Sequence, residues 1–256
     1  MGGFVRATTK WAAFAAALLI GCASSTIAQA QAGKPQKQSA GGKSVCVASA
    51  LGHRFAMQRI GLMVFGNALQ HATVDSWGID EAAVRRIGQI AGAHGYSVRR
   101  VTLPKAAADA NASFGNLFDN PVRAQLRALA ATTKCSFYIT VKPSSRSYNG
   151  TNQHLSGLGI VETPGMFDRI FVFASFAVIV YDGSNFQTVK ISTPGNSEPG
   201  LMAGPSAMYK QVDRSWVPAT PQAAAQSVQL RNTSRALVEE GMSKALMGVF
   251  EPGLWR

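Results

Sequence analysis

Ser156 is the residue whose surroundings come closest to a nucleophilic site. The segment His154-Leu155-Ser156-Gly157 places a serine hydroxyl before a glycine, as in the G-x-S-x-G turn that exposes the nucleophile of many serine hydrolases. The first glycine of that motif is missing, and Ile160-Val161-Glu162 downstream is typical of a strand where the motif requires a helix. We therefore predict no catalytic residue, and a hydrolase with an unrecognised site stays open as the alternative.

The sequence does not indicate metal or cofactor chemistry. No two of the four histidines stand at the spacing of a metal site, and the chain has neither an HExxH motif nor a Cys-x-x-Cys pair. These histidines are His53, His71, His94 and His154. We therefore predict no metal ligand and no cofactor.

The three cysteines indicate a different kind of chemistry. Cys22 follows Leu19-Ile20-Gly21, which resembles a bacterial lipobox, where the cysteine is lipidated and becomes the mature N-terminus. Ala28-Gln29-Ala30 offers a general signal-peptidase site instead, and the sequence leaves both open. Cys46 and Cys135 each stand at the start of an expected strand, so in an oxidising compartment they are candidates for a disulfide. Two buried free thiols are the alternative.

The N-terminal segment predicts export. Arg6 and Lys10 precede an apolar run over residues 11–20, which is too short to cross a bilayer as a helix and is typical of a signal peptide. We expect a signal peptide over residues 1–30, with cleavage before Cys22 as the lipoprotein alternative, and a flexible tether over residues 31–43. The mature protein is then periplasmic or anchored to the outer membrane, and it touches a membrane only through a lipid on Cys22.

The charge of the chain suggests its class of partner. The formal net charge is +12, but the cations are scattered, with pairs only at Arg85-Arg86 and Arg99-Arg100. A basic balance often indicates nucleic acid, which export argues against here. We therefore expect envelope proteins or anionic envelope polymers as partners and no nucleic acid.

A polar loop expected over residues 144–153 is the most distinctive candidate for binding. Its hydroxyl, amide, guanidinium and phenol groups could hold a glycan or an anionic headgroup by hydrogen bonding and stacking. The candidate binding residues are Ser145, Arg146, Tyr148, Asn149 and Asn152. An ordinary surface loop is the alternative.

Both strands and helices must position these residues. Alternating or continuous apolar runs predict strands over 44–51, 56–65, 96–103, 136–142, 155–162, 169–182 and 186–192. Capping residues and helical spacing predict two short helices, from Asp80 as N-cap to Gly95 and from Asn120-Pro121 onward, and a long helix from Thr220-Pro221 to about Val249. The residues expected to face the sheet are Val84, Ile87, Ile90, Val122, Leu126 and Leu129.

The element order predicts a single α/β (α+β) domain over residues 44–256. We expect one mixed sheet of about five to seven strands, with the two short helices and the long C-terminal helix packed on it. Lys134-Cys135-Ser136-Phe137-Tyr138-Ile139 enters one strand, and Val178-Ile179-Val180-Tyr181-Asp182-Gly183 ends another in a turn. In this order the chain resembles the α/β domain of the curli-secretion lipoprotein family and the N-terminal domain of the periplasmic Tol–Pal propeller family. The resemblance implies an envelope assembly or binding module and carries over no functional residue.

Two functions therefore remain open: a non-catalytic binding or assembly module of the envelope, and a periplasmic enzyme. An enzyme requires a pocket with convergent polar groups and a titratable residue of shifted pKa. A binding module requires an exposed apolar surface or an unpaired sheet edge. These requirements are what the structure must distinguish.

Overall fold

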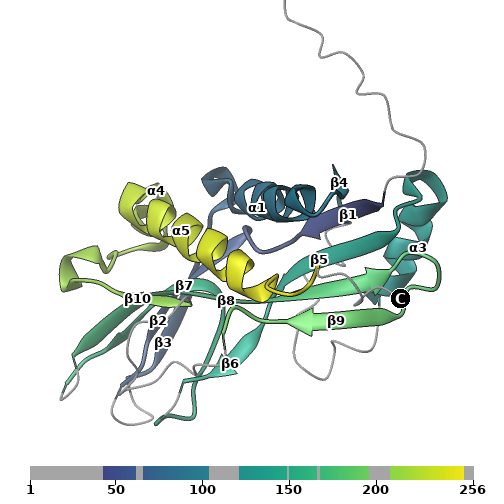
Figure 1. Ribbon diagram of the computed structural model, residues 1–256. Coiled ribbons are helices and arrows are strands. Elements are labelled where there is room, and N and C mark those ends of the chain that lie inside the picture. Colours follow the sequence, from purple (N-terminus) through teal and green to yellow (C-terminus); the bar gives the residue numbers. More distant parts are fainter. Residues whose placement is uncertain are drawn as a thin grey trace, which may run out of the picture. The chain divides into compact units, whose positions relative to one another are not determined.

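The computed structural model describes residues 43–61, 66–103, 121–148, 150–165, 168–195 and 208–250. The signal peptide, Cys22 and nearly all of the tether therefore lie outside the described residues. The described residues form one mixed sheet with helices packed on it (Figure 1). No helix among the described residues is long and apolar enough to cross a membrane.

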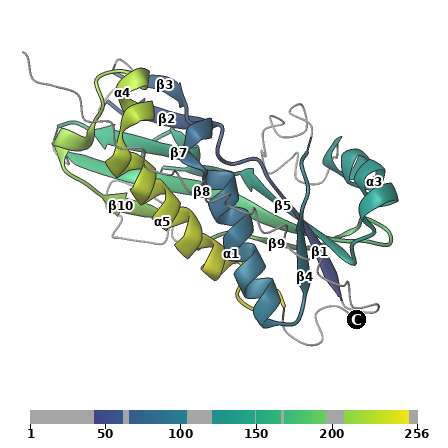
Figure 2. The same cartoon turned by 90° about the horizontal axis from the view of Figure 1, so that it is seen from above.

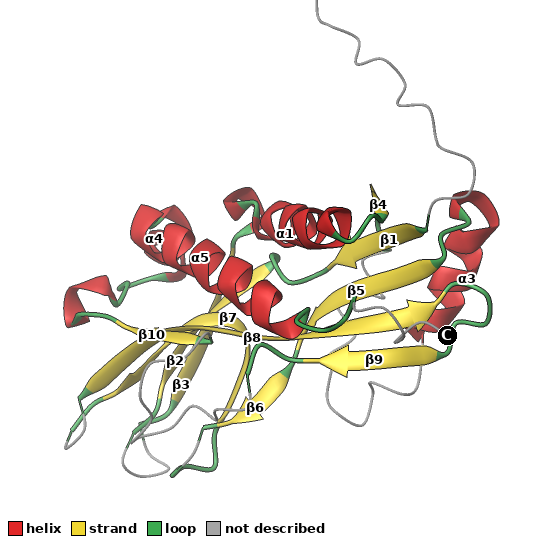
Figure 3. Cartoon of the chain, viewed as in Figure 1, coloured by secondary structure: helices red, strands yellow, loops and turns green. Residues whose placement is uncertain are grey.

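The described residues form a sheet of ten strands. Figure 3 distinguishes these strands from the helices by colour. In chain order they are β1 (Ser44–Ser49), β2 (Arg54–Arg59), β3 (Ala68–Thr73), β4 (Ser97–Arg100), β5 (Phe137–Pro143), β6 (Ser145–Ser147), β7 (His154–Thr163), β8 (Arg169–Asp182), β9 (Thr188–Ser192) and β10 (Tyr209–Gln211). The helices are α1 (Ile79–Ala93), α3 (Pro121–Thr133), α4 (Pro221–Gln226) and α5 (Val228–Ala245), and short 3-10 turns cover Asp75–Trp77 and Arg214–Trp216. The predicted α/β class and single mixed sheet are confirmed, with three short strands (β3, β6 and β10) beyond those expected.

Strand β8 is the common member of two half-sheets. Its residues 176–182 pair with β5, and its residues 169–175 pair with β7. Shorter strands add to each half of β8, β9 to the first and β10 to the second. The main path of the sheet is therefore β3-β2-β7-β8-β5-β1-β4, with β3 and β4 at its two ends.

A glycine allows the two half-sheets to diverge. The first residues of β7 pair with β6, and from Gly157 onward β7 pairs with β8 instead. Gly157 has a φ of 70°, a left-handed conformation that other residues rarely adopt. A Cβ atom at this position would lie 3.6 Å from the Cβ of Pro143, the last residue of β5. The backbone of β7 therefore bends at Gly157, where β5, β6 and β7 lie next to one another.

The helices cover opposite faces of the sheet. Helices α1 and α5 lie side by side on one face, while α3 lies apart from them (Figure 2). Ile87 of α1 is fully buried in a cluster that includes Val178 of β8, and Leu126 of α3 is fully buried in a different cluster with Tyr138 of β5. Val84, Ile90 and Leu129 are partly buried against the same two clusters, as predicted. The side chain of Val122 lies outside the description.

Asp80 does not cap α1, contrary to the prediction. The helix begins at Ile79, and Gly78 precedes it in the left-handed conformation. The Asp80 carboxylate accepts hydrogen bonds from Ser49 Oγ at 2.5 Å and from the backbone nitrogens of Leu51 at 2.8 Å and Gly52 at 3.2 Å. It therefore ties the β1–β2 turn to the start of the helix.

The long C-terminal helix predicted from residue 221 onward is two helices. Ser227 has an extended backbone, with φ −70° and ψ 110°, and separates α4 from α5. Its hydroxyl accepts a hydrogen bond from the Leu230 nitrogen at 3.2 Å, so it is the N-cap of α5. A serine that satisfies a free N–H group in this way stabilises a new helix start at the expense of a continuous helix.

Candidate functional site

Tyr148, the aromatic residue of the predicted binding loop, does not lie at the surface. The Tyr148 side chain is fully buried, in a cluster that contains Leu155 and Phe171. Burial raises the pKa of its hydroxyl. The expectation that Tyr148 stacks on a ligand is therefore wrong, because the segment before it forms strand β6 and turns back into β7.

The other residues of that loop are distributed along the hairpin. Ser145 and Arg146 are half-buried in β6, and Asn152 is exposed in the turn. Asn149 lies outside the described residues. Ser156 is exposed in β7, where the strand continues, so its hydroxyl does not sit on a strand-to-helix turn.

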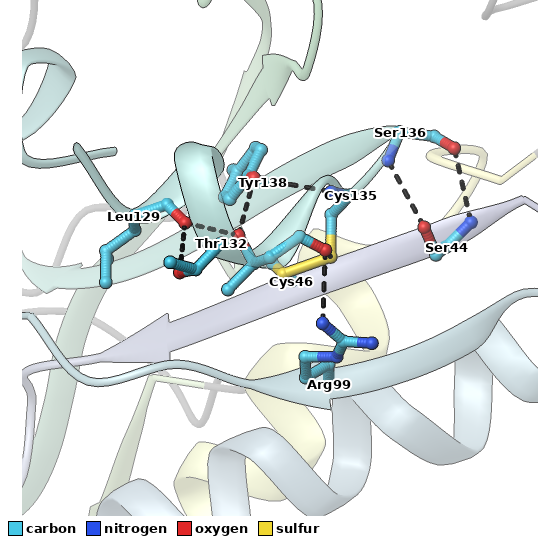
Figure 4. The surroundings of a disulfide bond; sticks show 9 residues. Ser44, Cys46, Arg99, Leu129, Thr132, Cys135, Ser136 and Tyr138 are labelled. Carbon is cyan, nitrogen blue, oxygen red and sulfur yellow. Dashed lines mark hydrogen bonds between the residues drawn. A yellow bond between two sulfur atoms is a disulfide. The ribbon is translucent and has the colours of Figure 1, made fainter. Parts of the chain in front are cut away.

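The structure joins Cys46 and Cys135 in a disulfide (Figure 4). Cys46 in β1 and Cys135 before β5 have Cα atoms 5.7 Å apart and are separated by 89 residues. Both are buried, and β1 and β5 are parallel neighbours in the sheet. The bond therefore links the first strand of the domain to the strand that follows α3.

Hydrogen bonds hold the chain around the disulfide in place. Arg99 Nη1 donates to the Thr133 carbonyl at 3.1 Å, and the Cys135 nitrogen donates to the Tyr138 hydroxyl at 3.3 Å. Ser44 and Ser136 exchange two bonds, each from a backbone nitrogen to the other hydroxyl at 3.3 Å. The polar groups around the disulfide therefore bond to one another within the protein. We assign the disulfide and its surroundings a structural role.

A pocket lies in the other half-sheet, where β2, β3 and β7 meet the segment before α4. Its volume is about 270 Å³. Aliphatic side chains form part of its lining, and an amide and charged groups form the rest. The lining residues are Met57, Gln58, Arg59, Ala68, Gln70, Ile160, Glu162, Val217, Pro218 and Ala219.

Two arginines share one carboxylate at this pocket. Glu162 lies 3.4 Å from Arg59 Nε and 3.4 Å from Arg214 Nη1, and Arg214 also forms an ion pair with Asp168. The Glu162 side chain is 15% exposed, whereas those of Arg59 and Arg214 are 54% and 55% exposed. Because a guanidinium has five N–H donors, both arginines keep donors for a carboxylate that arrives from solvent.

Strand β3 lies at the rim of the pocket and at the end of the sheet. It pairs with β2 through six consecutive residues, Arg54↔Thr73 to Arg59↔Ala68, without a bulge. The structure pairs its other edge with no described strand. Leu69 on this strand is 57% exposed. Partial loss of hydration of the imidazole, followed by the charge of Arg54, lowers the pKa of the exposed His71.

The remaining edge strands differ from β3 in their charge. Lysine or arginine on an edge strand discourages the addition of a further strand. Such a residue occurs in each of the other described edge strands, at Arg99 and Arg100 in β4, Arg146 in β6, Lys190 in β9 and Lys210 in β10. The six residues of β3, Ala-Leu-Gln-His-Ala-Thr, include neither a lysine, an arginine nor a proline. Among the described edge strands, β3 is therefore the one without this protection.

Comparison with known proteins gives structural neighbours only. No family model and no curated protein matches the chain. A PelC dodecamer structure from Paraburkholderia phytofirmans is similar over 77% of this chain and 89% of that one, with 12% identity and a TM-score of 0.26. A lipoprotein from Neisseria meningitidis is similar over 58% of this chain and 78% of its own, with 11% identity and a TM-score of 0.25. A protein from Xanthomonas campestris is similar over 81% of this chain and 82% of its own, with 7% identity and a TM-score of 0.32. Superpositions with such low scores support no inference about function.

Proposed function

We propose that this chain is an exported envelope protein that binds, without catalysis, an extended acidic segment of another envelope protein. The segment adds to the sheet along β3. The observation that carries this proposal is the edge of β3, which has no described partner strand, beside a pocket lined by the half-exposed Arg59 and by Glu162, with which the half-exposed Arg214 is paired. The signal-like N-terminus and the basic balance of the chain support the envelope as its place of action.

Strand addition accounts for the main-chain part of the recognition. An edge strand presents a row of N–H and C=O groups that an extended peptide can pair with. The regular pairing of β3 with β2 keeps that row straight. In this mode the main-chain bonds contribute affinity, and pockets for alternate side chains contribute specificity.

The pocket accounts for the side-chain part. Its volume of about 270 Å³ lies below the ~300–1,000 Å³ typical of small-molecule sites. A pocket of this size suits an apolar side chain used as an anchor against Met57, Ile160 and Val217. Acidic residues next to that anchor would meet Arg59 and Arg214, whose free donors favour carboxylates. We therefore expect a ligand with one large apolar residue flanked by Asp or Glu.

The introduction of a negative charge on β3 tests this proposal. Peptides are first selected on the mature protein from a displayed library of short random sequences. We expect acidic peptides with an apolar anchor, and binding to a Leu69→Glu variant that is at least about tenfold weaker, because the new carboxylate repels the peptide. Hydrogen exchange of the β3 amides should slow when the selected peptide binds. Dissociation constants from fluorescence anisotropy give the comparison.

The matched control is Val189→Glu, which places the same charge on β9, where Val189 is 38% exposed. Its affinity for the selected peptides should equal that of the unmodified protein. Equal loss in both variants, or selection of peptides without acidic residues, would contradict the proposal. Binding of isolated anionic polysaccharide in place of peptides would instead identify the partner as an envelope polymer. Turnover of ester substrates that depends on Ser156 would favour the hydrolase alternative.

The predicted lipid anchor has its own test, because Cys22 lies outside the described residues. A Cys22→Ser variant should still be exported through the site at Ala30, but it should lose both membrane fractionation and labelling by radioactive palmitate. The unmodified protein, expressed in the same strain, is the control. Membrane association that is unchanged by the substitution would show that the protein is not a lipoprotein.

A further inference from the structure

Three strands begin at the end of the sheet where the predicted tether joins the domain. Strand β1 starts at Ser44, and its neighbours β4 and β5 run parallel to it. The register pairs Ser44 with Ser97 of β4 and Val45 with Phe137 of β5, so the three strands start level with one another. We call this end of the domain, which comprises residues 43–44, 96–99 and 133–136, the tether end.

Three exposed cations lie at the tether end, one in each of its segments. They are Lys43 before β1, Arg99 in β4 and Lys134 between α3 and β5. The Ser97 nitrogen donates to the Lys43 carbonyl at 3.1 Å. Arg99 Nη1 donates to the carbonyl of Thr133, the residue before Lys134, at 3.1 Å, and Figure 4 shows its side chain pointing from β4 toward the disulfide. These bonds hold the three basic segments next to one another.

The three cations are not neutralised by described carboxylates. None of them takes part in an ion pair within the described part of the chain, whereas the exposed Arg85 and Arg100 are each paired with a glutamate. Asp182 of β8 pairs with the first residue of β5. Its carboxylate, however, already accepts hydrogen bonds from the backbone nitrogen of Ser184 at 2.7 Å and from the hydroxyl of the same residue. The tether end is therefore a positively charged surface.

The segment that leads to the tether end has the same sign of charge. Residues 23–43, which include the predicted tether, contain Lys34, Lys37 and Lys43 and neither Asp nor Glu. A flexible linker of this length has an average end-to-end distance of roughly 25 Å. The predicted lipid on Cys22 would therefore keep the tether end close to a membrane surface.

We propose that the tether end binds an anionic phospholipid surface through Lys43, Arg99 and Lys134. This electrostatic contact is additional to the predicted lipid on Cys22. Basic residues near an anionic membrane each favour binding, and a basic patch strengthens the weak attachment that an acyl chain gives. A surface of many headgroups suits cations that are spread over the ends of three segments. Strand β3 lies at the opposite end of the path of the sheet from β4, so its edge stays free for a peptide.

Co-sedimentation with vesicles tests this proposal. The mature protein, with Cys22→Ser to exclude lipidation, is mixed with vesicles of phosphatidylcholine alone or with an equal part of phosphatidylglycerol. We expect binding to the anionic vesicles only, and its loss at high salt, because salt screens exposed charges. A double variant, Arg99→Gln with Lys134→Asn, should bind at least about tenfold more weakly, since each charge near the membrane contributes about a fivefold factor. Asparagine suits the left-handed backbone at position 134, where φ is 49°.

The matched control is Arg54→Gln with Lys210→Gln, which removes two exposed cations from the other half-sheet. Its affinity for anionic vesicles should stay within about twofold of that of the unmodified protein, because these cations are far from the tether end along the sheet. Circular dichroism verifies that both double variants are folded, and the salt titration of the unmodified protein tests the charges without any substitution.

Three results would overturn the proposal. Equal weakening in the two double variants would mean that only the net charge matters. Equal binding to both kinds of vesicle, or binding to neither, would mean that the tether end does not recognise anionic lipid. Displacement of the protein from the vesicles by an isolated anionic polysaccharide that binds more tightly would identify an envelope polymer as the partner of this surface.

Discussion

A double variant in which alanine replaces both Cys46 and Cys135 is expected to have a free energy of unfolding that is lower by about 4–5 kcal/mol. The disulfide closes a loop of 89 residues, and in the chain-entropy model the cross-link stabilises by restricting the unfolded chain. The reduced chain must also bring β1 and β5 together without a covalent link. Guanidinium denaturation of the mature oxidised protein and of the double variant gives the comparison. The midpoint should fall, and the dependence on denaturant should rise, because the unfolded chain without the cross-link is less compact and exposes more surface.

The unmodified protein in reductant is the control for this experiment, and its stability should fall toward that of the double variant. Non-reducing mass spectrometry of protein from the periplasm should give a mass two hydrogens below that of the dithiol. If both thiols are alkylated without prior reduction, the bond does not form in the producing compartment. A double variant as stable as the oxidised protein would contradict the expected stabilisation.

The elements that the sequence predicted best are those whose burial is the same along their whole length. The expected strand over residues 169–182 coincides with β8, because its inner twelve residues are buried on both faces and therefore form a continuous apolar run. The hairpin from β8 to β9 was also predicted from the Asp182-Gly183 turn. In both cases the local composition and the tertiary environment favour the same conformation.

Edge strands were harder to predict from the sequence. The expected strand over 56–65 corresponds to β2, which begins earlier at Arg54 and ends at Arg59. The strand after it, β3, was missed because only Ala72 in it is buried. An exposed strand has little apolar pattern, so its conformation depends on the partner strand. The feature that carries the proposed function therefore left almost no trace in the hydrophobic pattern.

Polar composition was a poor guide to exposure around Tyr148. The surrounding Ser, Arg, Asn and Gly residues are typical of a surface loop. The chain nevertheless turns tightly there, with the Tyr148 nitrogen donating to the Gln153 carbonyl at 2.8 Å. This turn directs the ring into a cluster formed by distant strands, which the local sequence does not encode. Arg59 and Glu162 show the same limit, because only the parallel pairing of β2 with β7 brings them together.

The burial of Lys142 could not be predicted from the sequence, although its strand was. Thr140 and Lys142 both lie in the stretch expected over residues 136–142. A lysine in a strand usually indicates an exposed face, and in β5 the six residues from Phe137 to Lys142 are all buried. That burial depends on layers on both sides of the sheet. The low exposure of Lys142 therefore became visible only once the fold was known.

Core substitutions on the two faces of the sheet test whether it is indeed covered on both sides. Ile87→Ala in α1 and Leu126→Ala in α3 should each lower the free energy of unfolding by ~2–5 kcal/mol. Both side chains are 0% exposed, so alanine removes buried methylene groups and leaves a cavity. Each effect is measured as the shift of the denaturation midpoint of the oxidised mature protein.

The combination of the two substitutions gives the sharper result. Ile87 and Leu126 belong to separate core clusters on opposite faces of the sheet, so their effects should add within about 0.5 kcal/mol in the double variant. Met247→Ala, at a side chain that is 74% exposed, is the control and should change stability little. Strong non-additivity would mean that α1 and α3 share one core. A midpoint unchanged by Leu126→Ala would mean that α3 does not cover the sheet.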